Sequence, residues 1–317
     1  MNEKNLTAED LPPAEFFFAL TFYACLCIIV GLMGNVGVIV YNTVINDTKT
    51  PTTYFLVNLA ISDIIVCVTF FPPWMFEFIS ILTETGNNHS PICKIRITSS
   101  YTSTALSIAN LLAITTDRCL FITKPLKYPR IMTWRRTYML LAVIWLLAIV
   151  NANFVYLNIG ETPEGAVRCT KKDKTTGTII TIFNFYIPVA GVLFLNYTIY
   201  KVATIQRRKI KECCSAQETI RASMNTARRR RHFQQMKMMK TFAIVLGVLL
   251  FCVLPQMIAS IIRQYFCQSS CIPISVAFSV TMIMGTNSVM NPLIYSVRSK
   301  EYRTVYLKFI TRLLGKS

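Results

Sequence analysis

Charge is scarce in this chain and almost absent from its longest stretches. Charged residues make up 15% of the 317 residues, whereas hydrophobic residues make up 53%. Asp63 is the only charged residue in seven apolar segments, each long enough to cross about 30 Å of hydrocarbon. No soluble fold of this size can bury that many uncharged runs. We therefore expect an all-α integral membrane protein, a seven-transmembrane helix bundle with spans at 16–41, 54–76, 97–116, 137–158, 175–200, 241–262 and 272–297.

Histidine is also rare, and few polar groups are placed to support chemistry. The two histidines, His89 and His232, lie outside the apolar segments. The chain therefore offers no buried Ser-His-Asp set and no cluster of metal ligands, and we expect no enzymatic activity. A channel or transporter needs several polar or charged sites along its path, and the chain lacks the internal repeats of many transporters. A channel or transporter is therefore the disfavoured alternative.

The excess of basic residues, a net charge of +18, follows the two sides of a membrane. Basic residues concentrate after every second apolar segment, in 124–136, in 201–240 and after Val297. Because loops rich in Lys and Arg stay in the cytoplasm, we place these segments inside and the N-terminus outside the plasma membrane. This pattern explains the charge without a nucleic-acid partner. The chain then divides into an outer tail (1–15), a seven-helix domain (16–297) and a cytoplasmic segment (298–317).

Two inner segments have helical patterns of their own. In 298–314, apolar residues recur three and four positions apart with basic residues between them, which predicts an amphipathic helix on the inner leaflet. These residues are Tyr302, Tyr306, Phe309 and Leu313. The 206–240 loop is polar and basic and lacks proline and glycine. We expect it to extend the fifth and sixth helices into the cytoplasm.

Four of the eleven cysteines fall on the predicted outer side, where disulfides form. They are Cys93, Cys169, Cys267 and Cys271. Four cysteines allow three connectivities. The short spacing of Cys267 and Cys271 favours a bridge between them, which leaves Cys93 to pair with Cys169. Two outer glycosylation sequons begin at Asn5 and Asn88, and Pro91 makes the second a poorer acceptor.

Each apolar segment carries a short motif, and the motifs occur in a set order. They are Gly34-Asn35-Val36 in the first, Asn58-Leu59-Ala60-Ile61-Ser62-Asp63 in the second, Cys93 and Asp117-Arg118-Cys119 at the outer and inner ends of the third, Trp145 in the fourth, Pro188 in the fifth, Phe251-Cys252-Val253-Leu254-Pro255 in the sixth, and Asn287-Ser288 with Asn291-Pro292-Leu293-Ile294-Tyr295 in the seventh. On these motifs, the chain resembles the rhodopsin-like class (class A) of G-protein-coupled receptors over about residues 16 to 314. The resemblance implies a receptor that binds an extracellular ligand within the bundle and activates a heterotrimeric G protein.

Polar side chains in separate apolar helices must find partners inside the bundle, because lipid offers none. Such a set consists of Asn35, Asp63, Ser107, Asn287, Ser288 and Asn291. We expect these residues to form a hydrogen-bonded network. The resemblance implies that the network is an allosteric sodium pocket at Asp63 that collapses on activation, and a carboxylate with hydroxyl and amide oxygens suits a hard cation. We expect no other cofactor.

The resemblance also implies which residues serve activation and coupling. Arg118 is expected to be held by Asp117, beside Cys119, and then released to contact the G protein. Pro255 and Pro292 each remove a helical hydrogen bond and are the implied hinges, and Tyr295 ends the motif of the seventh helix. Pro72 and Pro73 should bend the outer end of the second helix. Arrestin recruitment would rely on residues of the third inner loop, namely Ser215, Thr219, Ser223 and Thr226.

Four departures from the family pattern stand out. They are Cys119 in place of Tyr, Val253 in place of Trp in the sixth helix, Gln234 and Gln235 in place of an acid at the inner end of that helix, and Asn196 in place of Tyr in the fifth. Tyr197, next to Asn196, is a candidate substitute. Because the aromatic residue and the acid are both missing, the inactive state has fewer restraints, and we predict ligand-independent activity.

The outer tail, residues 1–15, is too short for a ligand-binding domain, so the ligand should enter the outer half of the bundle. The resemblance places eight residues around it, each equally able to be an ordinary hydrogen-bonded helix residue: Ser100, Tyr101, Thr104, Asn184, Gln256, Ser260, Arg263 and Thr281. Amine receptors of the class carry Asp where this chain has Ser100, and opsins carry the retinal-binding Lys where it has Gly285. The basic 160–174 loop, unless it is simply solvated, favours an anionic group on the ligand. We favour a short peptide over a small non-amine molecule or a lipid.

Overall fold

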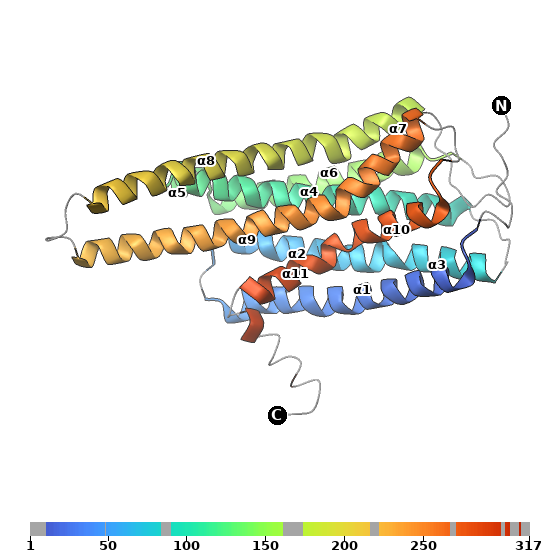
Figure 1. Cartoon of the computed structure of the whole chain (residues 1–317), viewed down its shortest axis with the longest axis horizontal. Coiled ribbons are helices and arrows are strands. Elements are labelled where there is room, and N and C mark those ends of the chain that lie inside the picture. Colours follow the sequence, from blue (N-terminus) through green and yellow to red (C-terminus); the bar gives the residue numbers. More distant parts are fainter. Residues whose placement is uncertain are drawn as a thin grey trace.

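The computed structural model consists of long helices joined by short connections (Figure 1). It describes residues 11–47, 49–83, 90–160, 174–215, 222–266, 271–298, 302–304 and 311. The α-helices are α1 (Ala14–Val40), α2 (Pro51–Thr69), α3 (Phe71–Leu82), α4 (Ser90–Thr123), α5 (Tyr128–Ile131), α6 (Trp134–Leu157), α7 (Lys174–Thr181), α8 (Ile187–Ser215), α9 (Ala222–Ile261), α10 (Ile274–Gly285) and α11 (Asn287–Arg298). Short π-helical segments follow α1, α7 and α9, at Tyr41–Ile45, Ile182–Tyr186 and Ile262–Phe266.

The seven predicted spans are all present as helices. Six are helical stretches long and apolar enough to cross a membrane: Ala14–Ile45, Pro51–Leu82, Ile92–Thr123, Trp134–Leu157, Thr175–Ile205 and Ala243–Ile261. The seventh is divided between α10 and α11, which are separated at Thr286. The prediction of a seven-helix membrane bundle is therefore confirmed. Several helices continue past the apolar segments and include charged residues such as Glu77 and Arg96.

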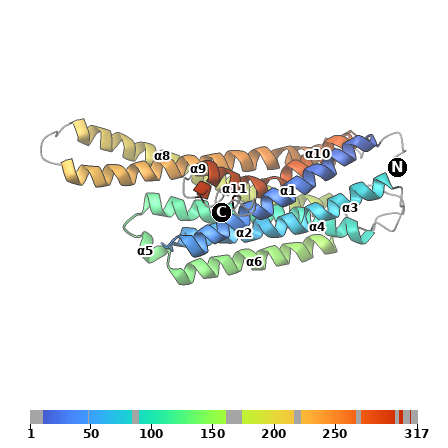
Figure 2. The same ribbon diagram turned by 90° about the horizontal axis from the view of Figure 1, so that it is seen from below.

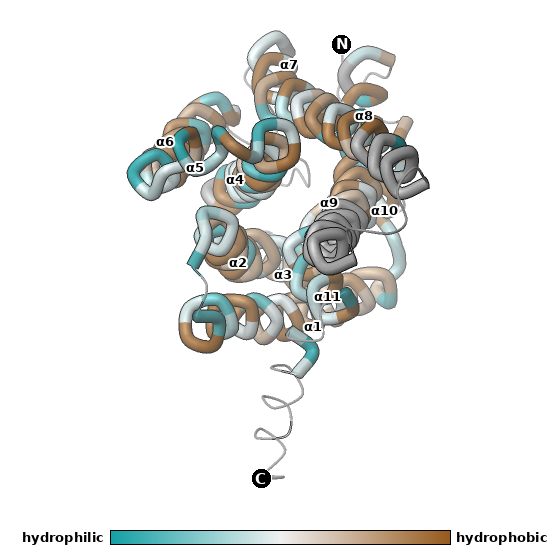
Figure 3. The backbone as a smooth tube through the Cα atoms, turned by 90° about the vertical axis from the view of Figure 1, so that its left-hand side faces the viewer, coloured by the Kyte–Doolittle hydropathy of each residue, from teal (hydrophilic) through white to brown (hydrophobic). Residues whose placement is uncertain are grey.

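The helices lie lengthwise in one bundle, and an end-on view shows them grouped around a common centre (Figures 2 and 3). α1 begins at one end of the bundle and α11 ends toward the other, as an odd number of crossings requires (Figure 1). α8 and α9 run beyond the other helices at that second end (Figures 1 and 2). Both are continuous into the predicted inner loop, α8 through Ser215 and α9 from Ala222. The predicted helical extension of the fifth and sixth spans is therefore confirmed, and its cytoplasmic location stays a prediction.

The second span is interrupted where the sequence places two prolines. α2 ends at Thr69, and α3 begins at Phe71, directly before Pro72 and Pro73. Proline has no N–H to donate and its ring clashes with the preceding turn, so the helix cannot pass this point unchanged. The predicted bend at the outer end of the second span is confirmed as a break in the helix.

Glycines allow α1 to approach its neighbours closely. A Cβ on Gly34 would lie only 2.7 Å from Cγ of Pro292 in α11, and one on Gly31 would lie 2.5 Å from Sγ of Cys67 in α2. Small residues at helix interfaces are typical of membrane bundles, in which van der Waals packing drives association. Gly34 is thus required for packing against the motif of the seventh span.

A chain of hydrogen bonds joins α6, α2 and α4. Trp145 Nε1 donates to Asn58 Oδ1 at 2.8 Å, and Asn58 Nδ2 donates to Asn110 Oδ1 at 2.5 Å. Asn110 Nδ2 in turn donates to Ser62 Oγ at 3.0 Å. Hydrogen bonds between polar side chains of different helices stabilise membrane bundles. Trp145 therefore has a packing role, away from the predicted ligand residues.

Candidate functional site

Asp63 lies where the predicted polar network brings the second and seventh spans together, and it is fully buried. Its Oδ2 accepts a hydrogen bond from Asn291 Nδ2 at 2.9 Å. Its Oδ1 has no hydrogen-bond partner among the described residues. Asn35 joins the first span to the same region, because its Nδ2 donates to the Ser288 carbonyl at 3.0 Å. The network therefore holds one carboxylate oxygen that the described chain leaves unsatisfied.

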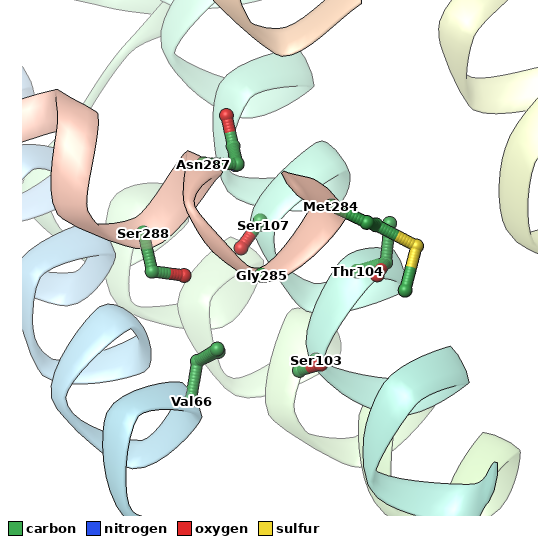
Figure 4. A pocket seen from close by; sticks show the side chains of 8 residues that line it. All are labelled: Val66, Ser103, Thr104, Ser107, Met284, Gly285, Asn287 and Ser288. Carbon is green, nitrogen blue, oxygen red and sulfur yellow. The ribbon is translucent and has the colours of Figure 1, made fainter. Parts of the chain in front are cut away.

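A small polar cavity lies beside this network (Figure 4). It is lined by Val66, Ser103, Thr104, Ser107, Met284, Gly285, Asn287 and Ser288. Val66 is one helical turn from Asp63, and Ser107, Asn287 and Ser288 bring three further predicted network residues to the wall. The space suits about one water molecule or a small ion. Hydroxyl and amide groups thus surround a site next to the buried carboxylate.

Arg118 and Asp117 form an ion pair at the inner end of α4. Arg118 Nη2 and Nε donate to Asp117 Oδ2 at 2.6 and 3.0 Å. Thr52 Oγ1 of α2 donates to the same oxygen at 2.6 Å, and Tyr128 OH of α5 donates to Oδ1 at 2.6 Å. The Arg118 guanidinium also lies 5.3 Å from the ring centre of Phe121. The predicted pair is therefore held by groups from three helices.

Thr52 and Tyr128 were not identified from the sequence. Tyr128 lies in a short inner loop, and Thr52 lies in the first turn of α2, where nothing in the local pattern connects either of them with Asp117. The sequence does, however, contain one indication that Asp117 has further hydrogen-bond donors. An ionised carboxylate offers about four acceptor sites, more than a single arginine fills, so a buried Asp117 implies additional donors nearby.

We predict that Tyr128→Phe destabilises the inner end of the bundle. Burial and the hydrogen bond to Asp117 raise the pKa of Tyr128 above its ordinary value, so the hydroxyl remains a donor across physiological pH. Loss of this half-buried hydrogen bond to a charged group should lower the free energy of unfolding by about 1–2 kcal/mol. Thermal unfolding of the detergent-solubilised protein measures the change, and its size should not vary between about pH 6 and pH 8.

Tyr200→Phe is the matched control for Tyr128→Phe, because the Tyr200 side chain is 68% exposed. It should unfold at the temperature of the wild type. Equal unfolding temperatures for the two variants would show that the Tyr128 hydroxyl contributes nothing to stability.

Tyr295, the last residue of the seventh-span motif, packs against the segment that follows α11. Its ring centre lies 5.8 Å from that of Tyr302. The π-helical segment after α1 holds Tyr302 in turn, because Asn42 Nδ2 donates to its hydroxyl at 2.7 Å and the Tyr41 ring lies 4.3 Å away. Residues 302–304 are helical, as predicted. Apart from Thr311, the rest of the predicted amphipathic helix lies outside the described residues.

The prolines of the implied hinges lie inside helices. Pro255 falls within α9 and Pro292 within α11. Val253, at the position where the family usually has Trp, is 1% exposed and packs in the main apolar core. A smaller aliphatic side chain thus fills this place. The side chains of Gln234 and Gln235 lie outside the described part of the chain.

The other two departures from the family pattern lie on α4 and α8. Cys119 is buried in a small apolar cluster with Ile122 and Ile199. Asn196 Nδ2 donates to the carbonyl of Val192, within its own helix, at 2.9 Å. The suggestion that Tyr197 substitutes for the usual Tyr is wrong, because its side chain is 63% exposed and so turned away from the bundle interior.

Several predicted ligand residues make hydrogen bonds within their own helices. These are Thr104 Oγ1 to the Ser100 carbonyl at 2.9 Å, Asn184 Nδ2 to the Ile180 carbonyl at 2.7 Å, Arg263 Nε to the Ala259 carbonyl at 3.3 Å and Thr281 Oγ1 to the Ala277 carbonyl at 2.8 Å. Such bonds fit the alternative that these are ordinary helix residues. Thr104 also lines the small cavity near Asp63.

Other predicted ligand residues connect different helices. Thr281 Oγ1 also donates to Gln256 Oε1 at 3.3 Å, which joins α10 to α9. Ser100 Oγ accepts from Trp74 Nε1 at 3.3 Å, which joins α4 to α3. The Tyr101 ring lies 5.7 Å from that of Phe185. Ser260 is half-buried on α9. Hydrogen bonds and ring contacts therefore connect predicted ligand residues with α3, α4, α9, α10 and the Ile182–Tyr186 segment.

Phe70 occupies the space beside Gly285. A Cβ at residue 285 would overlap the Phe70 ring, with its Cδ1 only 2.8 Å away. Phe70 is fully buried and makes an edge contact with Phe71 at 5.1 Å. The position at which opsins carry the retinal-binding lysine therefore has no room for a long side chain in this chain.

Two of the four predicted outer cysteines lie within the described residues. Cys93 and Cys271 are both disulfide-bonded. Cys169 and Cys267, together with the sequon residues Asn5 and Asn88, lie outside the described residues. The pairing of the cysteines and the glycosylation therefore stay predictions.

Comparison with known sequences agrees with this arrangement. The profile of the 7 transmembrane receptor (rhodopsin family) matches residues 34–295. The alpha-1A adrenergic receptor of Oryzias latipes is 27% identical over 304 residues, which cover 88% of this chain and 64% of that receptor. The adenosine receptor A2b of Gallus gallus is 28% identical over 316 residues, which cover 91% of this chain and 87% of that receptor. The chain thus spans less than two thirds of the adrenergic relative.

A solved structure gives the same fold. Squid rhodopsin superposes with a TM-score of 0.80 at 20% identity, and the match covers 99% of this chain and 92% of that one. The matched proteins are receptors rather than enzymes, which confirms that the chain is not an enzyme. The profile match spans more than half of the chain and includes every helix motif from Gly34 to Tyr295. The chain belongs to the rhodopsin family of seven-transmembrane receptors.

Proposed function

We propose that the protein is a plasma-membrane receptor that binds an extracellular ligand in the outer half of its bundle and activates a heterotrimeric G protein at its inner end. The observation that carries this proposal is the Arg118–Asp117 pair. Arg118 is a cation only 9% exposed, held at the inner end of α4 by contacts with Asp117 and Phe121. A relative movement of the helices that fix Asp117 would expose this cation to a partner. A contact set that two helix arrangements can make or break is the physical basis of a switch.

The distribution of charge supports the proposed orientation. Basic residues in 124–136, 201–240 and 298–317 support an orientation with the Arg118 end in the cytoplasm and the N-terminus outside. The extensions of α8 and α9 project from that end (Figure 1). Arrestin is a further proposed partner, through hydroxyl residues of the third inner loop such as Ser215 and Thr219.

We favour a short peptide as the ligand. The basic residues of the 160–174 loop and Arg263 at the end of α9 support an anionic group on it, such as a peptide carboxylate. Ser100 lacks the carboxylate with which amine receptors bind an ammonium at this position. A small non-amine molecule or a lipid is the alternative, and the likeness to an adenosine receptor gives the small molecule weight.

The test is guanine-nucleotide exchange on a panel of purified G-protein subtypes, mixed with membranes from cells that express the full chain. Exchange above that of membranes without the protein supports the proposal and names the coupled subtype. Sodium flux through vesicles that contain the protein, with no exchange on any subtype, would favour a channel or transporter and overturn it.

We also propose that Asp63 binds an allosteric sodium ion together with Ser107, Asn287 and Ser288. Two observations support this site. The Asp63 carboxylate has an oxygen with no partner in the described chain, and a cavity of suitable size lies beside it with oxygen-bearing walls (Figure 4). Hard cations prefer carboxylate, hydroxyl and carbonyl oxygens. Such an ion would stabilise the inactive arrangement.

Asp63→Asn should therefore remove the response to sodium. In wild-type membranes, replacing KCl with NaCl at constant ionic strength should lower basal nucleotide exchange, whereas the variant should exchange equally in both salts. Thr116→Ala is the control, because it removes a hydroxyl of α4 that does not line the cavity and that donates to the Leu112 carbonyl at 2.8 Å. An identical sodium response in wild type and Asp63→Asn would rule out the site.

A further inference from the structure

A second buried ion pair lies near the outer end of the bundle, between α3 and α4. Glu77 Oε1 is 3.0 Å from Arg96 Nη1, and the two side chains are only 5% and 4% exposed. Within the described part of the chain, the other ion pair is that of Arg118 with Asp117. The sequence analysis did not pair Glu77 with Arg96, because both residues fall just outside the apolar segments 54–76 and 97–116.

The pair is not explained by stability. Replacing a buried ion pair with apolar side chains is often neutral or stabilising, because both charges lose their hydration. Ionisable residues inside a membrane bundle mark functional sites by default. The second carboxylate oxygen of Glu77, Oε2, is buried and has no hydrogen-bond partner among the described residues. A buried acceptor in this state needs a donor, and a ligand is able to supply it.

Direct contacts connect the pair with the predicted ligand residues. The Arg96 guanidinium lies over the Trp74 ring, 4.5 Å from its centre. Trp74 Nε1 donates to Ser100 Oγ at 3.3 Å, and Ser100 Oγ donates to the Arg96 carbonyl at 2.8 Å. Glu77 is one turn from Trp74 on α3, and Arg96 is one turn from Ser100 on α4. The pair therefore forms the outer edge of the site that contains Ser100.

Aromatic side chains surround this edge. Trp74 lies 5.8 Å from Phe278, and Phe78 lies 5.4 Å from the same ring. Phe17 of α1 packs against both Phe78 and Phe278 at 6.0 Å. In such an apolar setting, charge–charge interactions are stronger than in water, and an unpaired charge is more costly. The net charge of a ligand should therefore determine whether it can bind at this edge.

Building on the function proposed above, we infer that Glu77 and Arg96 bind the head group of a zwitterionic ligand, with its ammonium on Glu77 and its carboxylate on Arg96. A ligand of a single charge would add an uncompensated charge to a neutral buried pair, whereas a zwitterion adds none. Arg96, whose Nη2 also lies 3.7 Å from Cys93 Sγ, would bind the carboxylate by a charge-assisted hydrogen bond, and Glu77 Oε2 would accept from the ammonium. Glu77 thereby supplies the carboxylate that Ser100 lacks.

Two ligand sources carry this arrangement of charges. A free α-amino acid has an ammonium and a carboxylate on one carbon. A short peptide amide that begins with Asp or Glu, and otherwise has uncharged residues, has one ammonium and one side-chain carboxylate and so no net charge, in keeping with the favoured peptide ligand. In both cases the rest of the molecule would lie against aromatic and hydroxyl groups such as Tyr101.

The test uses cells that express the full-length receptor and reports G-protein activation. The probes are the L-amino acids with uncharged side chains and dipeptide amides that begin with Asp or Glu and have an uncharged second residue, each with an N-acetylated and a methyl-esterified counterpart. We expect at least one zwitterion to activate and both of its blocked forms to lose roughly tenfold or more in potency. Activation by amino acids alone, or by dipeptides alone, identifies the source.

Variants assign the effect to the pair. Glu77→Gln and Arg96→Gln should each lower the potency of the active zwitterion by roughly tenfold or more, and Glu77→Gln should abolish its advantage over the acetylated form. Lys94→Gln is the matched control, because it removes the same charge two residues from Arg96, where Lys94 lies over the Tyr156 ring at 5.8 Å. The potency of the active zwitterion at Lys94→Gln should equal its potency at the wild type. Surface expression is measured throughout, and Glu77→Gln/Arg96→Gln, which keeps the net charge, replaces any single variant that fails to reach the surface.

Three results would overturn the inference: no zwitterion activates, the blocked forms act as strongly as their parents, or the pair variants respond like Lys94→Gln. The proposed function is judged separately, by basal nucleotide exchange that depends on Arg118. If that exchange is present and no zwitterion acts, the inference fails and the receptor function stands. If no G-protein signal of any kind is found, the proposed function fails as well.

Discussion

Arg118→Ala will abolish G-protein activation while the protein still reaches the cell surface. The substitution removes a largely buried cation that Asp117 holds at 2.6 Å. In the proposed active state Arg118 contacts the G protein, and truncating one partner of such a charged contact typically costs about 2–5 kcal/mol, which corresponds to a roughly 30-fold or larger loss of coupling. Basal exchange in membranes of the wild type and the variant, normalised to surface expression, measures the loss across G-protein subtypes.

The same measurement tests the prediction of ligand-independent activity. The wild type should show basal exchange above that of Arg118→Ala, because Val253 replaces the usual Trp and no acid is present at Gln234 or Gln235. Arg118→Lys is the informative control, since lysine keeps the charge but not the planar fork of arginine. It should retain a fraction of the signal. Equal basal exchange in wild type and Arg118→Ala would contradict the prediction of ligand-independent activity.

Gly285→Ala is the substitution that we expect to damage the fold most for its size. The added methyl group would overlap the ring of Phe70, which is fully buried and cannot move aside freely. Overpacking a tight core costs about 1–3 kcal/mol. Thermal unfolding of the solubilised receptor should therefore show a clear fall in stability, together with reduced surface expression.

Gly247→Ala provides the matched control for Gly285→Ala. A Cβ on Gly247 would meet nothing within 4 Å, and alanine is a better helix former than glycine by about 1 kcal/mol. This variant should be as stable as the wild type or more so. Phe70→Leu combined with Gly285→Ala should recover part of the loss, as expected when two residues compete for one space. Strict additivity of the two substitutions would contradict the proposed clash.

The seven spans and the polar residues around Asp63 were predictable because each depends on local sequence. A run of apolar residues is long enough to cross a bilayer or it is not, and a polar side chain inside such a run must find a partner in the bundle. Pro72 and Pro73 likewise fixed the position of the break in the second span. In each case the physical constraint acts within a few residues.

The Glu77–Arg96 pair and the Phe70–Gly285 contact depend on residues that are far apart in the sequence. The apolar segment of the second span ends before Glu77, and that of the third begins after Arg96. The search for transmembrane spans therefore left out both charged residues of this buried pair. Gly285 identified a missing lysine, but only the packing of Phe70, between α2 and α3, against α10 shows that an aromatic ring fills the place. Tyr128 was missed although it is near Asp117 in the sequence, because its bond to Asp117 joins two different helices, α5 and α4.

Because α9 is long, a small tilt of the helix moves its inner end over a large distance. From Pro255 to Ala222 the helix continues for 33 residues, a rise of about 50 Å. A tilt of about 10° at Pro255 would move Thr241, about 21 Å away, by roughly 4 Å, and Ala222 by roughly 9 Å. The displacement caused by a rotation at Pro255 therefore grows along the helix toward its inner end. A tilt too small to alter the packing around Val253 would still produce a large displacement at the end of α9 where the proposed G protein binds.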